Sequence, residues 1–169
     1  QTTHLFDAMN ALHHRKPGVV GASFDSGAYA ELICDGIHIH PSVVRIAFKL
    51  FGEKLILISD SVRCAGMPEG RYDLGGQAIT VKDGKATLAD GTIAGSSIHL
   101  LQAVANAVSF GIDPADAVTA ATLTPAQAIG MDADIGSLAV GKRADMLLLD
   151  RQFNLVTTII NGKAIHHEA

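Results

Sequence analysis

Two histidines and an aspartate, His4, His38 and Asp60, stand where polar residues follow apolar segments of the chain. Imidazoles and carboxylates bind divalent metals or move protons to and from a metal-bound water. The ordinary pKa of an aspartate is about 3.9, so Asp60 would be ionised at neutral pH and able to carry such a proton. The intervals between the three residues match none of the short zinc-binding spacings. The pattern therefore indicates a shared site without defining it.

Each candidate residue also has a structural interpretation. Asp60 could cap a helix after its strand, and His38 could bond to a loop backbone. Arg15 could be a solvated turn charge or a bidentate phosphate ligand. Cys34 ends an apolar run and is interpreted as a buried small hydrophobe. The histidines interpreted as surface, packing or tail residues are His13, His14, His40, His99, His166 and His167.

Apolar strands and a helix must position His38 and Asp60. Segments 31–35 and 54–60 predict buried strands, and the segment between them predicts a helix that begins at Pro41 and ends at Gly52. Two fully apolar strands separated by a helix indicate a parallel sheet covered on both faces. Ligands bind such sheets beyond the carboxyl ends of the strands, where both side chains are expected.

Other segments are antiparallel in character. Two hairpins are predicted, one with strands 78–82 and 85–88 around an Asp83-Gly84 turn and one with strands 156–160 and 163–165 around an Asn161-Gly162 turn. A further strand is predicted at 144–149. Helices are expected from a cap at Ser96 or Ser97, from Asp113-Pro114, and from Thr124-Pro125 up to Gly130. We therefore expect barrel-type segments at 1–69 and 93–135. The β segments at 70–92 and 136–169 are expected to meet as one small sheet domain.

Composition excludes several classes of protein. The net charge of −4 lacks the basic footprint of a nucleic-acid-binding protein. No apolar run is long enough to predict a membrane span. Two cysteines in 169 residues do not form a disulfide framework, so reduced thiols and a cytoplasmic location are expected.

Taken together, six motifs resemble the N-acetylglucosamine-6-phosphate deacetylases of the metal-dependent amidohydrolase superfamily. The motif most specific to these deacetylases is Thr-His-Leu-Phe-Asp-Ala-Met at 3–9, followed by Arg15. The others, in the family's order, are Asp-Gly-Ile-His at 35–38, Ser-Asp at 59–60, and the segments 70–76, 90–96 and 135–146. The last of these is common to amidohydrolases in general.

The resemblance implies an α/β fold, the C-terminal part of a (β/α)8 TIM barrel with a small β-sandwich domain built from both chain ends. His4 would end barrel strand six as a metal ligand, His38 would end strand seven and contact substrate, and Asp60 would end strand eight as the general base and acid. The remaining substrate contacts that it implies are Asp7, Ala8, Arg15, Asp35, Gly36, Ile37, Ile93, Ala94 and Gly95.

The implied reaction is hydrolysis of the acetamide of N-acetylglucosamine 6-phosphate to glucosamine 6-phosphate and acetate. The expected cofactor is a divalent metal, zinc first, with iron(II) or another ion as alternatives. The expected partners are the amino-sugar phosphate, a second subunit whose site Arg15 enters, and a missing N-terminal portion of the same protein.

Two departures from the family pattern leave alternatives open. Asp7 stands where the family usually has Asn, so the substrate could be a different N-acetyl amino sugar or a cyclic amide. The family's other metal ligands, a glutamate and a histidine, are not among these 169 residues, and catalytic zinc uses about three protein ligands. The chain alone is therefore expected to be inactive, and a non-catalytic fragment is the third interpretation.

Overall fold

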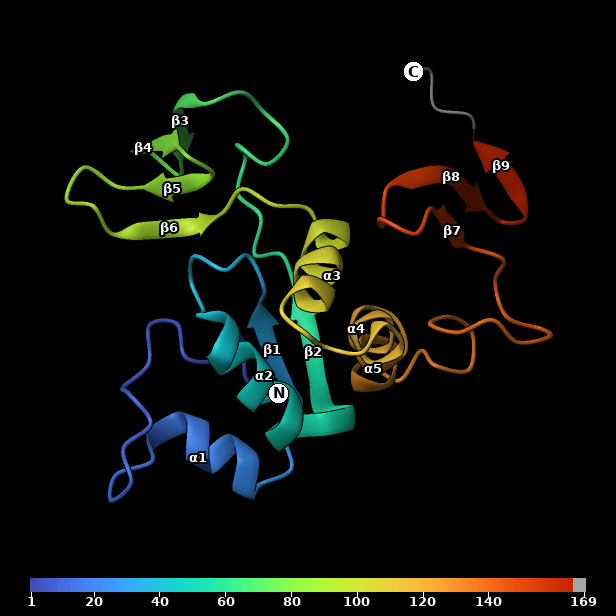
Figure 1. The fold of residues 1–169 in the computed structure, drawn as a ribbon, viewed down its shortest axis with the longest axis horizontal. Coiled ribbons are helices and arrows are strands. Elements are labelled where there is room, and N and C mark those ends of the chain that lie inside the picture. Colours follow the sequence, from blue (N-terminus) through green and yellow to red (C-terminus); the bar gives the residue numbers. More distant parts are fainter. Residues whose placement is uncertain (166–169) are drawn as a thin grey trace.

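The structure is a computed structural model that describes residues 1–165; residues 166–169, including His166 and His167, lie outside the described part (Figure 1). It is a mixed α/β arrangement with one small parallel sheet and two antiparallel sheets. Within the described residues no closed barrel forms, because the parallel sheet has two strands. The longest helix there has 11 residues, so none of the described helices could cross a bilayer.

The parallel unit lies at the centre of the molecule. Helix α1 (Gly18–Asp25) precedes β1 (Ala30–Ile33), and α2 (Pro41–Phe51) with the 3-10 helix η1 (Gly52–Lys54) connects β1 to β2 (Leu55–Ile58). The two strands pair in parallel with Leu32 opposite Leu57, which confirms the predicted strand–helix–strand unit. Thr2 bridges the other side of β1 at Ala30. Consequently β1 is central and β2 is an edge strand within the described residues.

Three helices cover β2: α3 (Leu100–Ser109), α4 (Pro114–Ala121) and α5 (Leu123–Ala128). Small residues such as Ala103, Ala107 and Ala117 are fully buried and let these helices approach the strand closely. The core that results also includes Leu32 and Leu57. This packing sets where the ends of β1 and β2 lie relative to each other.

Two predicted helix starts are wrong. Helix α3 begins at Leu100 with His99 at its N-cap, because Ser96 is the last residue of a strand and the Ser97 hydroxyl donates to the Gly84 carbonyl. Thr124 lies buried inside α5 rather than capping it, since only Thr122 separates α4 from α5. The predicted cap at Asp113 is confirmed, its carboxylate accepting from the Ala115 amide at 2.8 Å.

The antiparallel strands form two sheets. One has the order β3 (Gly70–Leu74), β4 (Gln77–Lys82), β5 (Lys85–Thr87) and β6 (Ile93–Ser96), and the other has β7 (Met146–Leu149), β8 (Leu155–Ile160) and β9 (Lys163–Ile165). Both predicted hairpins are confirmed, with two left-handed residues in each turn. Instead of meeting in one hydrogen-bonded sheet, the two groups lie apart on either side of α3 (Figure 1).

Candidate active site

The structure gathers the titratable groups that follow Thr2, β1 and β2. The charge of His38 interacts with those of Asp35, Asp7 and Asp60, and the charge of Asp7 also interacts with that of His4. Parallel strands present their carboxyl ends at one edge, so residues far apart in the chain converge there. Asp7 thus interacts electrostatically with all three residues that the sequence pattern assigns to a shared site, His4, His38 and Asp60.

His4 lies in a tight turn after the Thr2 bridge. Leu5 is fully buried and its amide donates to the Glu31 carbonyl at 2.6 Å, which attaches the turn to β1. His4 itself has a positive φ of 33°. Its Nδ1 lies 3.1 Å from the Asp7 carbonyl oxygen, which can only accept, so Nδ1 carries the proton. In the neutral ring Nε2 then has a free lone pair, the form that ligates a metal.

Asp7 has an unusual environment for a carboxylate. Its Oδ2 is buried and has no hydrogen-bond partner, alone in this respect among the described side chains. Burial raises the pKa of Asp7, the charges of His38 and His4 lower it, and those of Asp35 and Asp60 raise it, with a net increase above the ordinary value. Protonation is therefore easier for Asp7 than for a solvated aspartate.

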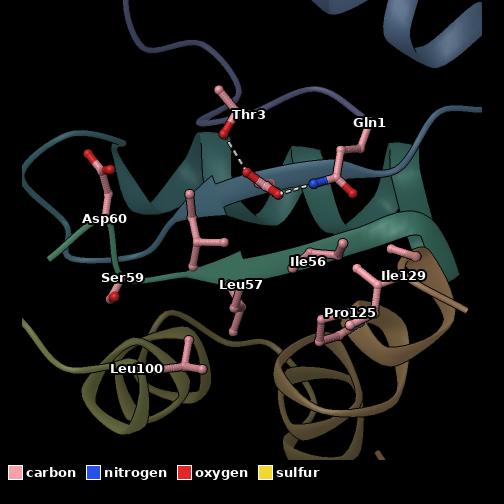
Figure 2. Close-up of a pocket in the computed structure, with 12 residues that line it drawn as sticks. Gln1, Thr3, Ile56, Leu57, Ser59, Asp60, Leu100, Pro125 and Ile129 are labelled. Carbon is pink, nitrogen blue, oxygen red and sulfur yellow. Dashed lines mark hydrogen bonds between the residues drawn. The ribbon is translucent and has the colours of Figure 1, made fainter. Parts of the chain in front are cut away.

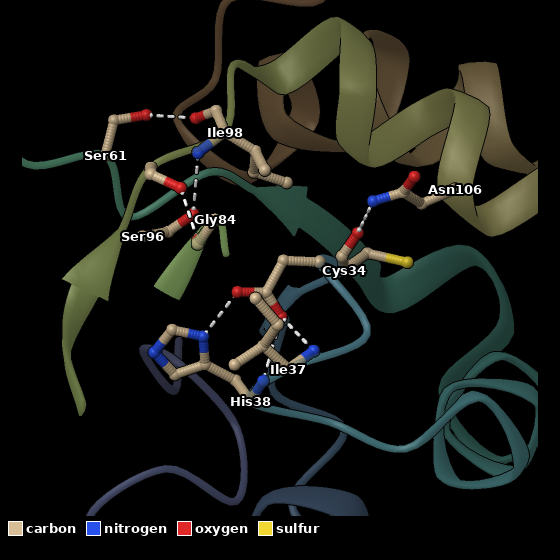
Figure 3. A network of polar contacts seen from close by, with 10 residues as sticks. Cys34, Ile37, His38, Ser61, Gly84, Ser96, Ile98 and Asn106 are labelled. Carbon is tan, nitrogen blue, oxygen red and sulfur yellow. Dashed lines mark hydrogen bonds and ion pairs between the residues drawn. The ribbon is translucent and has the colours of Figure 1, made fainter. Parts of the chain in front are cut away.

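Asp35 and His38 form a buried pair within a single turn (Figure 3). Asp35 Oδ2 and His38 Nδ1 are 2.6 Å apart, while Asp35 Oδ1 accepts from the amides of Ile37 and His38 at 2.8 and 2.9 Å. The interpretation of His38 as a histidine bonded to loop backbone is therefore wrong, because its ring bonds to a carboxylate. Asp35 and His38 are only three positions apart, and the glycine that follows Asp35 is a turn signal in the sequence that could have predicted their contact.

The two pKa values of this pair move in opposite directions. Burial alone would raise the pKa of Asp35, but the hydrogen bonds from His38 and Ile37 outweigh burial and hold it below its ordinary value. The hydrogen bond to Asp35 raises the pKa of His38, burial opposes the increase, and the charges of Asp35, Asp7 and Asp60 add to it. Both shifts favour a carboxylate beside an imidazolium.

Asp60 follows β2 and is held through its backbone rather than its side chain. Its carbonyl accepts from the Ser96 amide at 2.9 Å, and the Val62 amide donates to the Ser96 carbonyl at 2.9 Å, which joins this segment to β6. No helix begins near Asp60, so the helix-cap interpretation is wrong. Its carboxylate is exposed and makes no side-chain hydrogen bond within the described residues.

Segment 93–95 approaches Asp60 closely at Gly95. That glycine has a φ of +70°, and a Cβ placed on it would lie 2.3 Å from Val62 Cγ1 and 3.2 Å from the Asp60 carbonyl oxygen. Only glycine permits this approach without displacement of the neighbours. Ile93 and Ala94 reach the same region as part of β6.

Arg15 lies in an exposed turn before α1, between His13 and Lys16, which form an isolated antiparallel bridge. Its guanidinium donates to His14 Nε2 at 2.8 Å, and the ring of His14 lies 4.3 Å from that of His13. The sequence indicated Arg15 as a candidate but not its contact with His14, because adjacency in the chain does not predict that two side chains bond to each other. Cys34 is fully buried as predicted, and burial raises the pKa of its thiol to about 12.

A groove of about 450 Å³ runs along β2 and ends at Asp60 (Figure 2). One wall is polar: Glu31 accepts from Gln1 at 2.7 Å and from Thr3 at 2.5 Å. The opposite wall is apolar and comes from α3 and the α5 region, through Leu100, Pro125 and Ile129. An edge strand beside an open groove has backbone groups available for pairing.

A complete metal site is not formed by the described residues. Among residues 1–165 there is no group of three or more His, Cys, Asp and Glu side chains that could hold a metal ion. The ring of His4 contacts a carbonyl through Nδ1, as metal-ligating histidines do, but one imidazole does not make a catalytic zinc site. Any such site needs ligands from outside the described residues.

Comparisons with known proteins agree with the motifs. The model of the Amidohydrolase family matches residues 2–165. The "Putative N-acetylgalactosamine-6-phosphate deacetylase" of Escherichia coli (strain K12) is 40% identical over 95% of this chain and 97% of its own length. The N-acetylglucosamine-6-phosphate deacetylase of Pasteurella multocida superposes with a TM-score of 0.94 at 35% identity, covering 98% of this chain and 44% of that one.

A structure of a mutant Mycobacterium smegmatis N-acetyl-D-glucosamine-6-phosphate deacetylase, in complex with N-acetyl-D-glucosamine-6-phosphate, superposes with a TM-score of 0.88 at 34% identity, over 96% of this chain and 44% of that one. The chain thus spans nearly the whole of the E. coli relative and less than half of the two enzymes of known structure. With its family model matched almost from end to end, the chain belongs to the amidohydrolase family, as a homologue of N-acetylhexosamine-6-phosphate deacetylases.

Proposed function

We propose that the protein to which this chain belongs hydrolyses the acetamide of an N-acetylhexosamine 6-phosphate to the amino-sugar phosphate and acetate. The observation that carries the proposal is the convergence of Asp60, His38 and His4 at the strand ends. N-acetylglucosamine 6-phosphate is the first candidate substrate, because the motifs resemble those of its deacetylases. N-acetylgalactosamine 6-phosphate is the second, because the E. coli relative bears that name.

Asp60 is the proposed general base and acid. Its exposed carboxylate has no hydrogen-bond partner among the described residues. It takes a proton from the water that attacks the acetamide carbon, and returns that proton to the amine nitrogen as the C–N bond breaks. Acetate and the free amine are the products, so the carboxylate is regenerated.

The metal would be held in part by Nε2 of His4, with the remaining ligands supplied from outside this chain. When bound, a divalent ion such as zinc, or iron(II) as the alternative, would polarise the amide carbonyl. The contribution of this chain is to orient the imidazole: the His4 Nδ1–H donates to the Asp7 carbonyl, which leaves the lone pair of the neutral ring on Nε2.

The substrate contacts are proposed from the family resemblance. His38 would contact the sugar, together with the turn formed by Asp35, Gly36 and Ile37. The phosphate would bind the backbone at Asp7 and Ala8 and at residues 93–95. Backbone binding suits Asp7, because a carboxylate side chain beside a phosphate dianion is unfavourable.

A homodimer is proposed because the family resemblance implies that Arg15 enters a neighbouring subunit's site, and its side chain is exposed in the turn before α1. An arginine there is placed to bind a phosphate in a neighbouring subunit, and guanidinium suits bidentate phosphate contact. The N-terminal portion proposed from the resemblance would pair with the edge of β2, cover its groove, complete the (β/α)8 barrel and the sandwich domain, and provide the absent ligands. The chain alone would then be inactive.

The test is Asp60→Asn in the intact protein. We expect turnover of the preferred substrate to fall by about 10²- to 10⁴-fold while binding of the sugar phosphate is kept. Asp73→Asn is a matched control, because Asp73 is exposed in β3 and an asparagine retains its acceptor for the Gly76 amide. Undiminished turnover in Asp60→Asn would exclude the proposed role.

Substrate comparison separates the enzymatic alternatives. The glucosamine and galactosamine derivatives should be compared with and without the 6-phosphate. Equal rates on phosphorylated and unphosphorylated sugars would favour a different amidohydrolase, such as one acting on another amino sugar or a cyclic amide. A stoichiometric, tightly held zinc on this chain alone would contradict the proposed need for outside ligands.

A further inference from the structure

The carboxylate of Asp35 is fully occupied within its own turn. One oxygen accepts from two backbone amides, of Ile37 and His38, and the other accepts from the His38 ring at 2.6 Å. Only 3% of the Asp35 side chain is exposed, against 8% of the His38 side chain. A ligand therefore has no access to this carboxylate, although the segment belongs to the candidate site.

The turn that carries this pair is held from outside. Gly36 has a φ of +74°, and a Cβ there would lie 3.0 Å from the ring of Phe110, so only glycine fits without strain. Just before the turn, Asn106 on α3 donates to the Cys34 carbonyl at 2.9 Å (Figure 3). The turn is thus attached to α3, and the ring of His38 is held by a rigid support.

The contact with Asp35 also decides which nitrogen of His38 carries a proton. An ionised carboxylate can only accept, so Nδ1 must be the donor. Nε2 makes no hydrogen bond within the described residues and is the nitrogen left for a ligand. The same logic applies to histidines in metal and catalytic sites, where a second residue sets the tautomer.

We propose that Asp35 is a positioning residue that fixes the His38 ring with its proton on Nδ1 and presents Nε2 to the sugar substrate. The identity of that ligand rests on the proposed function, whereas the orientation of the ring does not. Neutral His38 accepts from a sugar hydroxyl through Nε2, and protonated His38 donates to a sugar oxygen. The charged groups that act on the ring are Asp35 in its own turn, Asp7 after the Thr2 bridge and Asp60 after β2.

The first test is the tautomer of His38, read from histidine ¹⁵N chemical shifts in the intact wild-type protein. We expect the proton of the neutral ring on Nδ1; a neutral ring protonated on Nε2 would overturn the proposal. His38→Gln identifies the signal by its loss. This measurement needs neither turnover nor an Asp35 variant, so it stands even if the proposed reaction is wrong.

The second test is Asp35→Asn. The asparagine oxygen can still accept from both amides, but its NH₂ group donates to Nδ1 and should move the proton of the neutral ring to Nε2. Asp113→Asn is the control, since Asp113 caps α4 and its carboxylate, like that of Asp35, accepts from the amide two residues later. An unchanged His38 tautomer in Asp35→Asn would contradict the proposal.

Kinetics distinguish positioning from general structural support. We expect Asp35→Asn to lower kcat/KM by about 10- to 100-fold, as removal of a histidine's supporting partner typically does. In a His38→Gln background the same change should have little further effect, because Asp35 acts through His38. A full additional loss in that background would show that Asp35 acts by another route.

Discussion

Replacement of Gly95 by alanine should destabilise the protein far more than the same change at Gly91. Both glycines have left-handed backbones, with φ of +70° and +85°. They differ in what a Cβ would meet: at Gly95 it would lie 2.3 Å from Val62 Cγ1, whereas at Gly91 nothing lies within 4 Å. The pair therefore separates backbone strain from steric overlap.

The expected magnitudes follow from these two contributions. The left-handed conformation costs an alanine about 1–2 kcal/mol at either position. Overpacking at Gly95 adds about 1–3 kcal/mol, because Val62 is β-branched and cannot easily rotate away. The free energy of unfolding should fall by about 2–5 kcal/mol in Gly95→Ala and by about 1–2 kcal/mol in Gly91→Ala.

Urea unfolding of the intact protein measures both losses, and Val62→Ala tests their cause. Removal of Val62 Cγ1 should relieve most of the overlap, so Gly95→Ala with Val62→Ala should be more stable than the sum of the single changes by about 1 kcal/mol or more. Only the Asp60 carbonyl, at 3.2 Å, would remain close. Equal losses at Gly95 and Gly91, or strict additivity with Val62→Ala, would refute the steric argument.

Three further outcomes are expected of the intact protein. Leu57→Ala should cost about 2–5 kcal/mol in urea unfolding, whereas Leu138→Ala, at a side chain 83% exposed, should change stability by less than about 0.5 kcal/mol. The pKa of His38 is raised above 6.5, so the stability that this residue contributes is fully present below pH 6.5 and is lost as pH rises through the raised pKa. The pKa of Asp35 is lowered below 3.8, so the stability that this residue contributes is fully present above pH 3.8 and is lost as pH falls through the lowered pKa. The stability lost in Asp35→Asn should therefore be greatest between pH 3.8 and 6.5, and a pH-independent loss would be inconsistent with these shifts. Arg15→Ala should raise KM for the phosphorylated sugar by about tenfold or more, as loss of a charged contact does, with unchanged urea stability because the side chain is exposed.

Features that depend on neighbours in the chain could be predicted from the sequence. The turns at Asp83-Gly84 and Asn161-Gly162 and the cap at Asp113 all form as expected, because each depends on backbone preferences and contacts within a few residues. The sequence also predicted the helix that begins at Pro41 and the parallel pairing of β1 with β2. Both strands contain apolar runs, which are typical of strands in a sheet that is buried on both faces.

Long-range contacts decided where local signals failed. Ser96 has the sequence features of a helix cap, but pairing with Lys85 of β5 and a bridge to Ser61 make it the last residue of a strand. Asn106 holds the carbonyl of Cys34 across 72 positions, and no local pattern predicts that contact. The antiparallel segments separate into two sheets for the same reason, since strand pairing depends on which partners meet in space.

The sequence by itself determined the family, through motifs that place His4, His38 and Asp60 in a known order. Only the tertiary structure decided what surrounds those residues: the buried unpartnered oxygen of Asp7 and the carboxylate of Asp35 against the His38 ring. The physical reason is that residue type and spacing define which chemistry is possible. Burial and hydrogen-bond partners, which arise only when distant segments pack together, set the charge and orientation with which each group acts.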